Sequence, residues 1–173
     1  MNKEKKIFYA LLFLSGKSIA FNKFKEILEP FDLENKLVEY VNDFNKLDIG
    51  LKIINVASGY QMVVDREIYE ECSKFFGFKS EKLTKSAKET IAIIAYNKSI
   101  TRQEIDYIRG VNSAGVIKQL LDKNLIKISG RKDVPGRPLL YSVTNEFYEY
   151  FGLNNISDLP TLREWQELKK EYD

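Results

Sequence analysis

The chain has 173 residues, of which 44 % are hydrophobic and 30 % are charged, a composition typical of one or two small globular domains. Its 27 lysines and arginines nearly balance 25 aspartates and glutamates, so the net charge of +2 argues against a dedicated nucleic-acid coat. With no histidine and one cysteine, the chain lacks the Ser-His-Asp and Cys-His catalytic sets, the commonest metal ligand and any internal disulfide.

The first half of the chain predicts four helices and a hairpin. The apolar run from Ile7 to Leu14 is too short to span a bilayer and lacks the small-residue end of a signal peptide. We therefore expect a core helix there, in a cytoplasmic protein. Strand-like runs at 51–56 and 60–64 flank Ala57-Ser58-Gly59 and indicate the hairpin. Apolar residues at helical spacing place the four helices at 7–14, about 22–30, 33–47 and 68–76.

The second half repeats this order. Ser86 and Glu89 have the spacing of a capping box and predict a helix start, and Thr101 with Glu104 repeats the spacing. Asn124 is placed to end a later helix in the left-handed conformation. Helices are expected from 86 to about 95, over 102–109, over 113–123 and through 147–151, and strands over 125–128 and 139–143.

The repeated order of three helices, a hairpin and a fourth helix predicts two tandem domains of similar fold. Three helices followed by a hairpin describe a winged helix, so we expect a mainly α protein with small antiparallel β-hairpins, of the α+β class. The predicted boundaries are 1–78 for an N-terminal winged-helix domain, 84–153 for a C-terminal one, and 154–173 for a tail with a possible short helix.

The loop from Gly130 to Pro138 holds two glycines, two prolines and four charges ahead of the last predicted strand. It does not match a phosphate-binding loop, because the glycine spacing is wrong and no helix follows. Basic residues on the hairpin and on neighbouring helices suit contacts to DNA phosphates, yet the helix after Ser113 has no arginine to read guanine. A solvated hairpin, a surface for an acidic protein partner and specific DNA reading all remain open. The basic residues are Arg109, Lys118, Lys127, Arg131, Lys132 and Arg137.

No catalytic, cofactor or metal constellation is recognisable in the sequence, since the carboxylate pairs lie on helix faces expected to be exposed. The tail places Leu162, Trp165 and Leu168 at i, i+3 and i+6, and Trp165 is the only tryptophan. This segment is expected to pack on its own molecule or dimer, or to dock on another chain.

Several sequence blocks resemble one known family. They are TIAIIAY at 90–96, TRQEI at 101–105, IRGVNS at 108–113, GRKDVPGRP at 130–138, Tyr141, YFGL at 150–153 and DLP at 158–160. Their order and spacing are similar to those of segregation and condensation protein B, ScpB. The match is dense from about 83 to 160 and weaker in the first half.

The resemblance implies an accessory protein without catalytic activity and without a cofactor. Family members form a homodimer through their N-terminal domains and bind the kleisin ScpA, which bridges the heads of the SMC ATPase in chromosome condensation and segregation. We expect weak or absent direct DNA binding and no membrane contact. The alternative is a winged-helix DNA-binding transcriptional regulator.

Two residue sets follow as hypotheses, the partner-binding set from the matched polar residues and the dimer set from apolar faces of the first domain that exceed what one small domain can bury. The hairpin residues among the partner-binding set have the alternative role of bracing their own domain. The expected partner-binding residues are Arg109, Asn112, Ser113, Arg131, Lys132 and Arg137. The expected dimer-interface residues are Phe8, Leu12, Phe21 and Phe24.

Overall fold

The computed structural model describes residues 2–28, 31–77 and 82–160. Its contacts divide the chain into two compact units, Met1–Ser80 and Glu81–Asp173. Each unit combines helices with one three-stranded antiparallel sheet, so the predicted α+β class with small antiparallel sheets is confirmed. Within the described ranges, no helix is long and apolar enough to cross a membrane.

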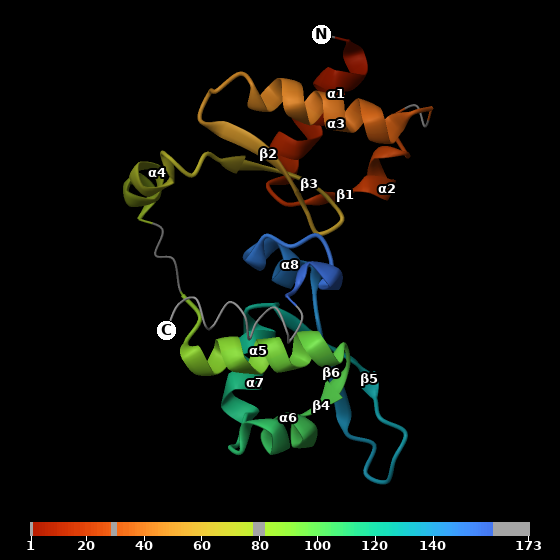
Figure 1. Ribbon diagram of the computed structural model, residues 1–173, viewed down its shortest axis with the longest axis vertical. Helices are drawn as coiled ribbons and strands as arrows, with labels where there is room; N and C mark the ends of the chain where they lie inside the picture. The colour runs from red at the N-terminus through yellow and green to blue at the C-terminus, as the bar shows by residue number, and fades with distance from the viewer. Residues whose placement is uncertain (1, 29–30, 78–81, 161–173) are drawn as a thin grey trace. The chain divides into compact units, whose positions relative to one another are not determined.

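The first unit sets two long helices against its sheet. Its elements are α1 (Lys3–Ser15), β1 (Ile19–Ala20), α2 (Phe21–Phe24), α3 (Leu33–Asn45), β2 (Leu51–Val56), β3 (Gly59–Val64) and α4 (Tyr69–Phe76). The strand order is β1-β3-β2, and α1 and α3 lie next to each other on the sheet (Figure 1). The short strand β1, where Ile19 pairs with Tyr60, extends the predicted hairpin. Two residues are too few to give a periodic sequence signal.

The core of the first unit is largely aromatic. The Phe8 ring is fully buried, with its centroid 5.1 Å from that of Phe24 and 5.7 Å from that of Tyr60, the latter edge-on. Such tilted and edge-on contacts are the arrangements that aromatic rings prefer. Leu12 follows Phe8 one helical turn later and is also buried.

These positions correct the predicted dimer interface. Phe8, Leu12 and Phe24 fill the core of their own unit and leave no surface for a second chain. The sequence pattern placed them on an apolar helix face, but α3 and the sheet already cover that face. Phe21 is partly buried against the same core, and the Lys25 ammonium lies 5.0 Å from the centre of its ring.

The second unit repeats the plan of the first. The first strand of its hairpin extends further toward the C-terminus than predicted, to Arg131. Its elements are α5 (Lys85–Asn97), β4 (Ile100–Thr101), α6 (Arg102–Arg109), α7 (Ala114–Asp122), β5 (Ile126–Arg131), β6 (Leu139–Val143), α8 (Asn145–Phe151) and the 3-10 turn η1 (Ile156–Asp158). The strand order is β4-β6-β5, and α5, α6 and α7 lie beside these strands (Figure 1). A register shift between Ile128 and Gly130 marks a bulge in β5.

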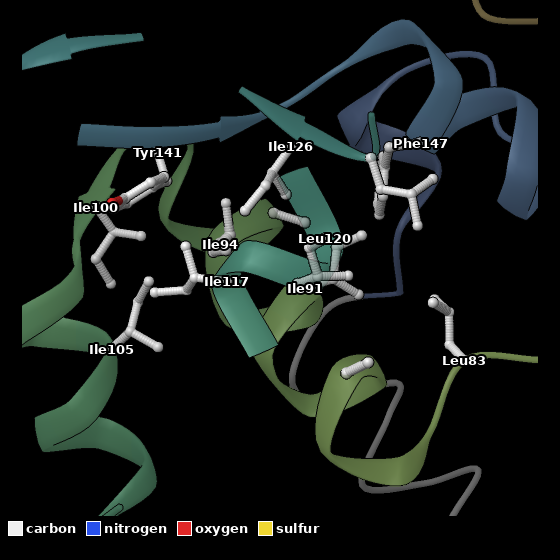
Figure 2. Packing of buried hydrophobic residues seen from close by; sticks show 13 residues of the cluster. Leu83, Ile91, Ile94, Ile100, Ile105, Ile117, Leu120, Ile126, Tyr141 and Phe147 are labelled. Carbon is white, nitrogen blue, oxygen red and sulfur yellow. The ribbon is translucent and has the colours of Figure 1, made fainter. Parts of the chain in front are cut away.

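An aliphatic core holds the helices of the second unit to its sheet. Ile94 of α5 and Leu120 of α7 are fully buried, and they lie at the centre of the cluster beside Ile117 (Figure 2). Tyr141 of β6 closes the sheet side of the core and pairs with both Ile100 and Ile128. This core fixes α6, α7 and the wing relative to one another, and the candidate site is built on these elements.

One predicted helix start is wrong and a second is confirmed. The first helix of the second unit begins at Lys85, because Thr84 accepts a hydrogen bond from the Ala87 amide at 3.2 Å, and the preceding Leu83 is anchored in the core. Ser86 therefore lies inside the helix and cannot form the predicted box with Glu89. The Thr101–Glu104 box of α6 is present with both of its reciprocal bonds.

Candidate functional site

Arg109 joins three of the helices of the second unit, α5, α6 and α7. Its guanidinium donates from Nη1 to the Ser113 hydroxyl at 2.9 Å and from Nη2 to the Ser86 hydroxyl at 2.7 Å. Its Nε is buried, and none of the described residues forms a hydrogen bond with it. Ser113 is fully buried, and its amide donates to Asp106 Oδ1 at 2.6 Å. Arg109 and Ser113 therefore hold the junction between α6 and α7 in place.

Asn112 has a different position at the same junction. Its side chain is exposed, and Oδ1 accepts a hydrogen bond from the Ala114 amide at 2.8 Å. This contact satisfies one of the free N–H groups at the start of α7. Asn112 thus caps α7 and also faces solvent, where a partner can reach it.

The wing, residues 129–138, comprises the end of β5 and the loop that leads to β6, and its backbone is hydrogen-bonded to itself. The Lys132 amide donates to the Pro138 carbonyl and the Arg137 amide to the Val134 carbonyl, each at 2.9 Å. The turn needs positive φ angles at Gly136 (+83°) and Arg137 (+39°), a region that favours glycine. The tip is consequently held in one shape by its own backbone.

Arg131 and Arg137 of the wing are exposed, whereas Lys132 pairs with a carboxylate of its own unit. Arg131 Nη1 donates to the Arg137 carbonyl at 3.1 Å, and both arginine side chains face solvent. Lys132 forms a salt bridge with Glu104 at the start of α6. The six residues expected to bind a partner therefore differ in exposure: Asn112, Arg131 and Arg137 are exposed, whereas Arg109, Ser113 and Lys132 are partly or fully buried.

Glu104 is the electrostatic centre of this arrangement. The hydrogen bond from Lys132, followed by those from the Thr101 amide and hydroxyl, lowers the pKa of its carboxyl to about 2. The Thr101 bonds measure 2.9 Å from the amide and 2.7 Å from the hydroxyl. One carboxylate thus caps α6 and also fixes the wing beside that helix.

We expect acidification to weaken the second unit through Glu104. The folded-state pKa of about 2 lies below the ordinary value of 4.5. The ionised carboxylate therefore contributes fully above pH 4.5, and its contribution is lost as the pH falls toward 2. Because 43 % of the side chain is exposed, we expect Glu104→Gln to cost only about 1 kcal/mol at pH 7. Amide hydrogen exchange in α6 and α7 at several pH values measures the difference from the wild type for the second unit alone.

The control for this measurement is Glu89→Gln, which removes an exposed carboxylate from α5. It should leave the stability within about 0.5 kcal/mol at every pH. A Glu104→Gln deficit of equal size at pH 7 and pH 2 would contradict the assigned role of this carboxylate.

Sequence reasoning missed two apolar features of the second unit. Tyr107 and Ile108 of α6, and Val111 just beyond its end, are exposed apolar residues, and the Tyr107 side chain is 89 % exposed. A separate apolar groove of about 440 Å³ lies between α5 and α8. The sequence signal that could have indicated this groove is the pair of small side chains at Ala92 and Ala95, which leave space beside α5. The groove is formed by Ala92, Ala95, Tyr96, Phe147, Phe151 and Pro160, among others.

The first unit also exposes large apolar side chains that the sequence did not single out. Phe13 and Leu14 are 71 % and 79 % exposed at the end of α1, and Phe75 and Phe76 of α4 are exposed as well. Among the described residues of both units, no cluster of three potential metal ligands occurs.

The element order and the two antiparallel sheets define a class: the chain has two units with the helices and hairpin of a winged helix. Comparison with known proteins then gives the family. The family model for segregation and condensation complex subunit ScpB matches residues 6–162, and the chain belongs to this family. Its members are non-catalytic accessory subunits, so the prediction that the chain is not an enzyme is confirmed.

Individual relatives extend over most of the chain. Segregation and condensation protein B of Syntrophotalea carbinolica is 44 % identical over 145 residues, which cover 84 % of this chain and 74 % of that protein. The protein of the same name from Clostridium tetani is 40 % identical over 172 residues, covering 96 % of this chain and 90 % of that one. The crystal structure of ScpB from Mycobacterium tuberculosis is 24 % identical, with a TM-score of 0.42, and covers 87 % of this chain and 96 % of that chain.

Proposed function

We propose that the chain is an accessory subunit of an SMC complex, a homodimer that binds the kleisin ScpA and through it SMC. In this role it supports chromosome condensation and segregation in the cytoplasm, at the nucleoid. The observation that carries the proposal is the family match over residues 6–162, which spans both units.

The exposed side of α6 and the wing are the proposed kleisin contact. Tyr107 and Ile108 of α6, with Val111 just after it, provide exposed apolar side chains, and aromatic side chains often anchor such interfaces. Arg131 and Arg137 add two guanidinium groups, which pair well with carboxylates. A kleisin segment that alternates apolar and acidic residues fits this surface. Arg109, Ser113 and Lys132 hold the surface in shape from beneath.

We expect the double variant Arg131→Glu/Arg137→Glu to weaken ScpA binding about tenfold or more while the fold remains intact. Reversing two exposed charges replaces attraction with repulsion at the partner's acidic groups, and tenfold corresponds to about 1.4 kcal/mol. Pull-down with the cognate ScpA followed by isothermal titration measures the effect, and circular dichroism checks folding. Unchanged affinity would show that the wing is not part of the ScpA contact.

The matched control is Lys85→Glu, a charge reversal at the exposed start of α5. It should leave ScpA affinity unchanged. The DNA-binding alternative gives the opposite pattern: no ScpA complex at micromolar concentrations, together with nanomolar, strongly salt-dependent binding to one DNA site.

The proposed homodimer rests on the exposed apolar side chains of the first unit. Phe13, Leu14, Phe75 and Phe76 are candidates for the buried surface, in place of Phe8, Leu12 and Phe24. Sedimentation equilibrium should give about twice the chain mass of 20.1 kDa. A stable monomer at high concentration would contradict the dimer and leave the kleisin contact to be tested separately.

A further inference from the structure

The groove between α5 and α8 has no role in the proposed partner surface. It is almost entirely apolar, and its floor is formed by Ala95 and Phe147, both of which are buried. Tyr96 and Phe151 stand at its sides and remain partly exposed. An open apolar groove of this kind suits an amphipathic segment that inserts large side chains.

The chain itself leads into this groove. Leu159 and Pro160, the last described residues, form part of its wall, and the Tyr96 hydroxyl donates a hydrogen bond to the Pro160 carbonyl. Upstream, the carboxylate of Asp158 accepts from the Asn154 amide at 2.6 Å and from the Asn155 amide at 3.2 Å. These bonds fix the path of the chain up to Pro160 at the wall of the groove.

We propose that the segment 161–173 of the same chain occupies the groove, with the Trp165 side chain inserted between α5 and α8. The segment carries large apolar residues only three apart, Leu162, Trp165 and Leu168, separated by polar ones. A helical turn would place these three side chains on one side. The earlier prediction for the tail lies outside the described residues, and the groove gives that segment a specific binding place.

Tethering explains why the chain's own tail is the occupant and not a second molecule. Trp165 is five residues from Pro160, a span of at most about 18 Å when fully extended. A short tether gives the tail an effective concentration in the millimolar range at its own groove. A free partner segment would have to compete with that concentration. The tail therefore closes the groove and covers the exposed sides of Tyr96 and Phe151.

The only tryptophan of the chain reports directly on this contact. In the full-length protein, Trp165 should show blue-shifted emission relative to the urea-unfolded chain, and protection from acrylamide. Ala92→Glu introduces a carboxylate at an exposed helical position of the groove wall, where the fold tolerates it. This variant should shift the emission toward the unfolded value and raise the quenching constant.

Asn97→Glu is the matched control, because it adds the same charge at an exposed position of α5 outside the groove. It should leave both signals as in the wild type. Unfolded-like emission in the wild type, or equal emission in both variants, would overturn the proposal. Burial of Trp165 that depends on protein concentration would assign the groove to a second copy. Burial that appears only after ScpA is added would assign it to a partner contact. Either result would overturn docking within the same chain.

Discussion

Phe8→Ala is expected to lower the free energy of unfolding of the first unit by about 3–5 kcal/mol. The ring is fully buried and contacts Tyr9, Phe24, Tyr40 and Tyr60, so its removal leaves a cavity that these large rings cannot fill. Because two units unfold in one chain, bulk denaturation curves mix their transitions. Amide hydrogen exchange in α1 and α3 measures the first unit alone.

Phe13→Ala is the control on the same helix. Phe13 is 71 % exposed, so the substitution should change the stability of the monomeric unit by no more than about 0.5 kcal/mol. If Phe13 lies in the proposed dimer interface, this variant weakens association instead. Equal loss of stability in both variants would contradict the assignment of Phe8 to the core and Phe13 to the surface.

Gly59→Ala is expected to cost about 1–3 kcal/mol, by forcing β1 away from β3. A Cβ atom at this position would lie 2.1 Å from the Ile19 carbonyl oxygen and 2.7 Å from the Ala20 Cα. Both neighbours are backbone atoms, so no side-chain rotation can relieve the contact. The β1 strand should lose hydrogen-exchange protection first, which amide exchange at Ile19 and Tyr60 would detect.

Gly115→Ala provides the opposite control. The added Cβ would meet nothing within 4 Å, and the residue lies in α7. We expect a gain of about 0.5–1 kcal/mol in the second unit, because alanine loses less backbone freedom on forming a helix. A neutral Gly59→Ala, or a destabilising Gly115→Ala, would show that backbone approach does not limit these two positions.

These experiments distinguish residues that stabilise the fold from residues that bind a partner. The sequence alone could not make that distinction. Arg109 and Lys132 matched the family pattern as well as Arg131 and Arg137 did, and all four are basic. In the structure, Arg109 and Lys132 bond to side chains elsewhere in their unit, whereas the Arg131 and Arg137 side chains are exposed and Arg131 bonds to the wing backbone. A charge reversal at Lys132 would consequently disturb the wing itself, so Arg131 and Arg137 are the informative positions for a binding test.

Local features of the fold were predictable from the sequence. The strand over Leu139–Val143, the left-handed Asn124 and the capping box of Thr101 and Glu104 all occur as expected. Each depends on residues only a few positions apart, because hydrogen bonds within a helix turn or along a strand set the preference. The family resemblance was equally available from short blocks of sequence.

Other features depended on contacts between distant segments. The strands β1 and β4 exist because Ile19 pairs with Tyr60 and Ile100 with Tyr141. Lys132 reaches Glu104 across 28 positions, and Arg109 reaches Ser86 across 23. Periodicity identifies which face of a helix is apolar, but it does not say what covers that face. Tertiary packing decided that Phe8 is core and Phe13 is surface, since burial depends on the neighbouring elements that the folded chain brings together.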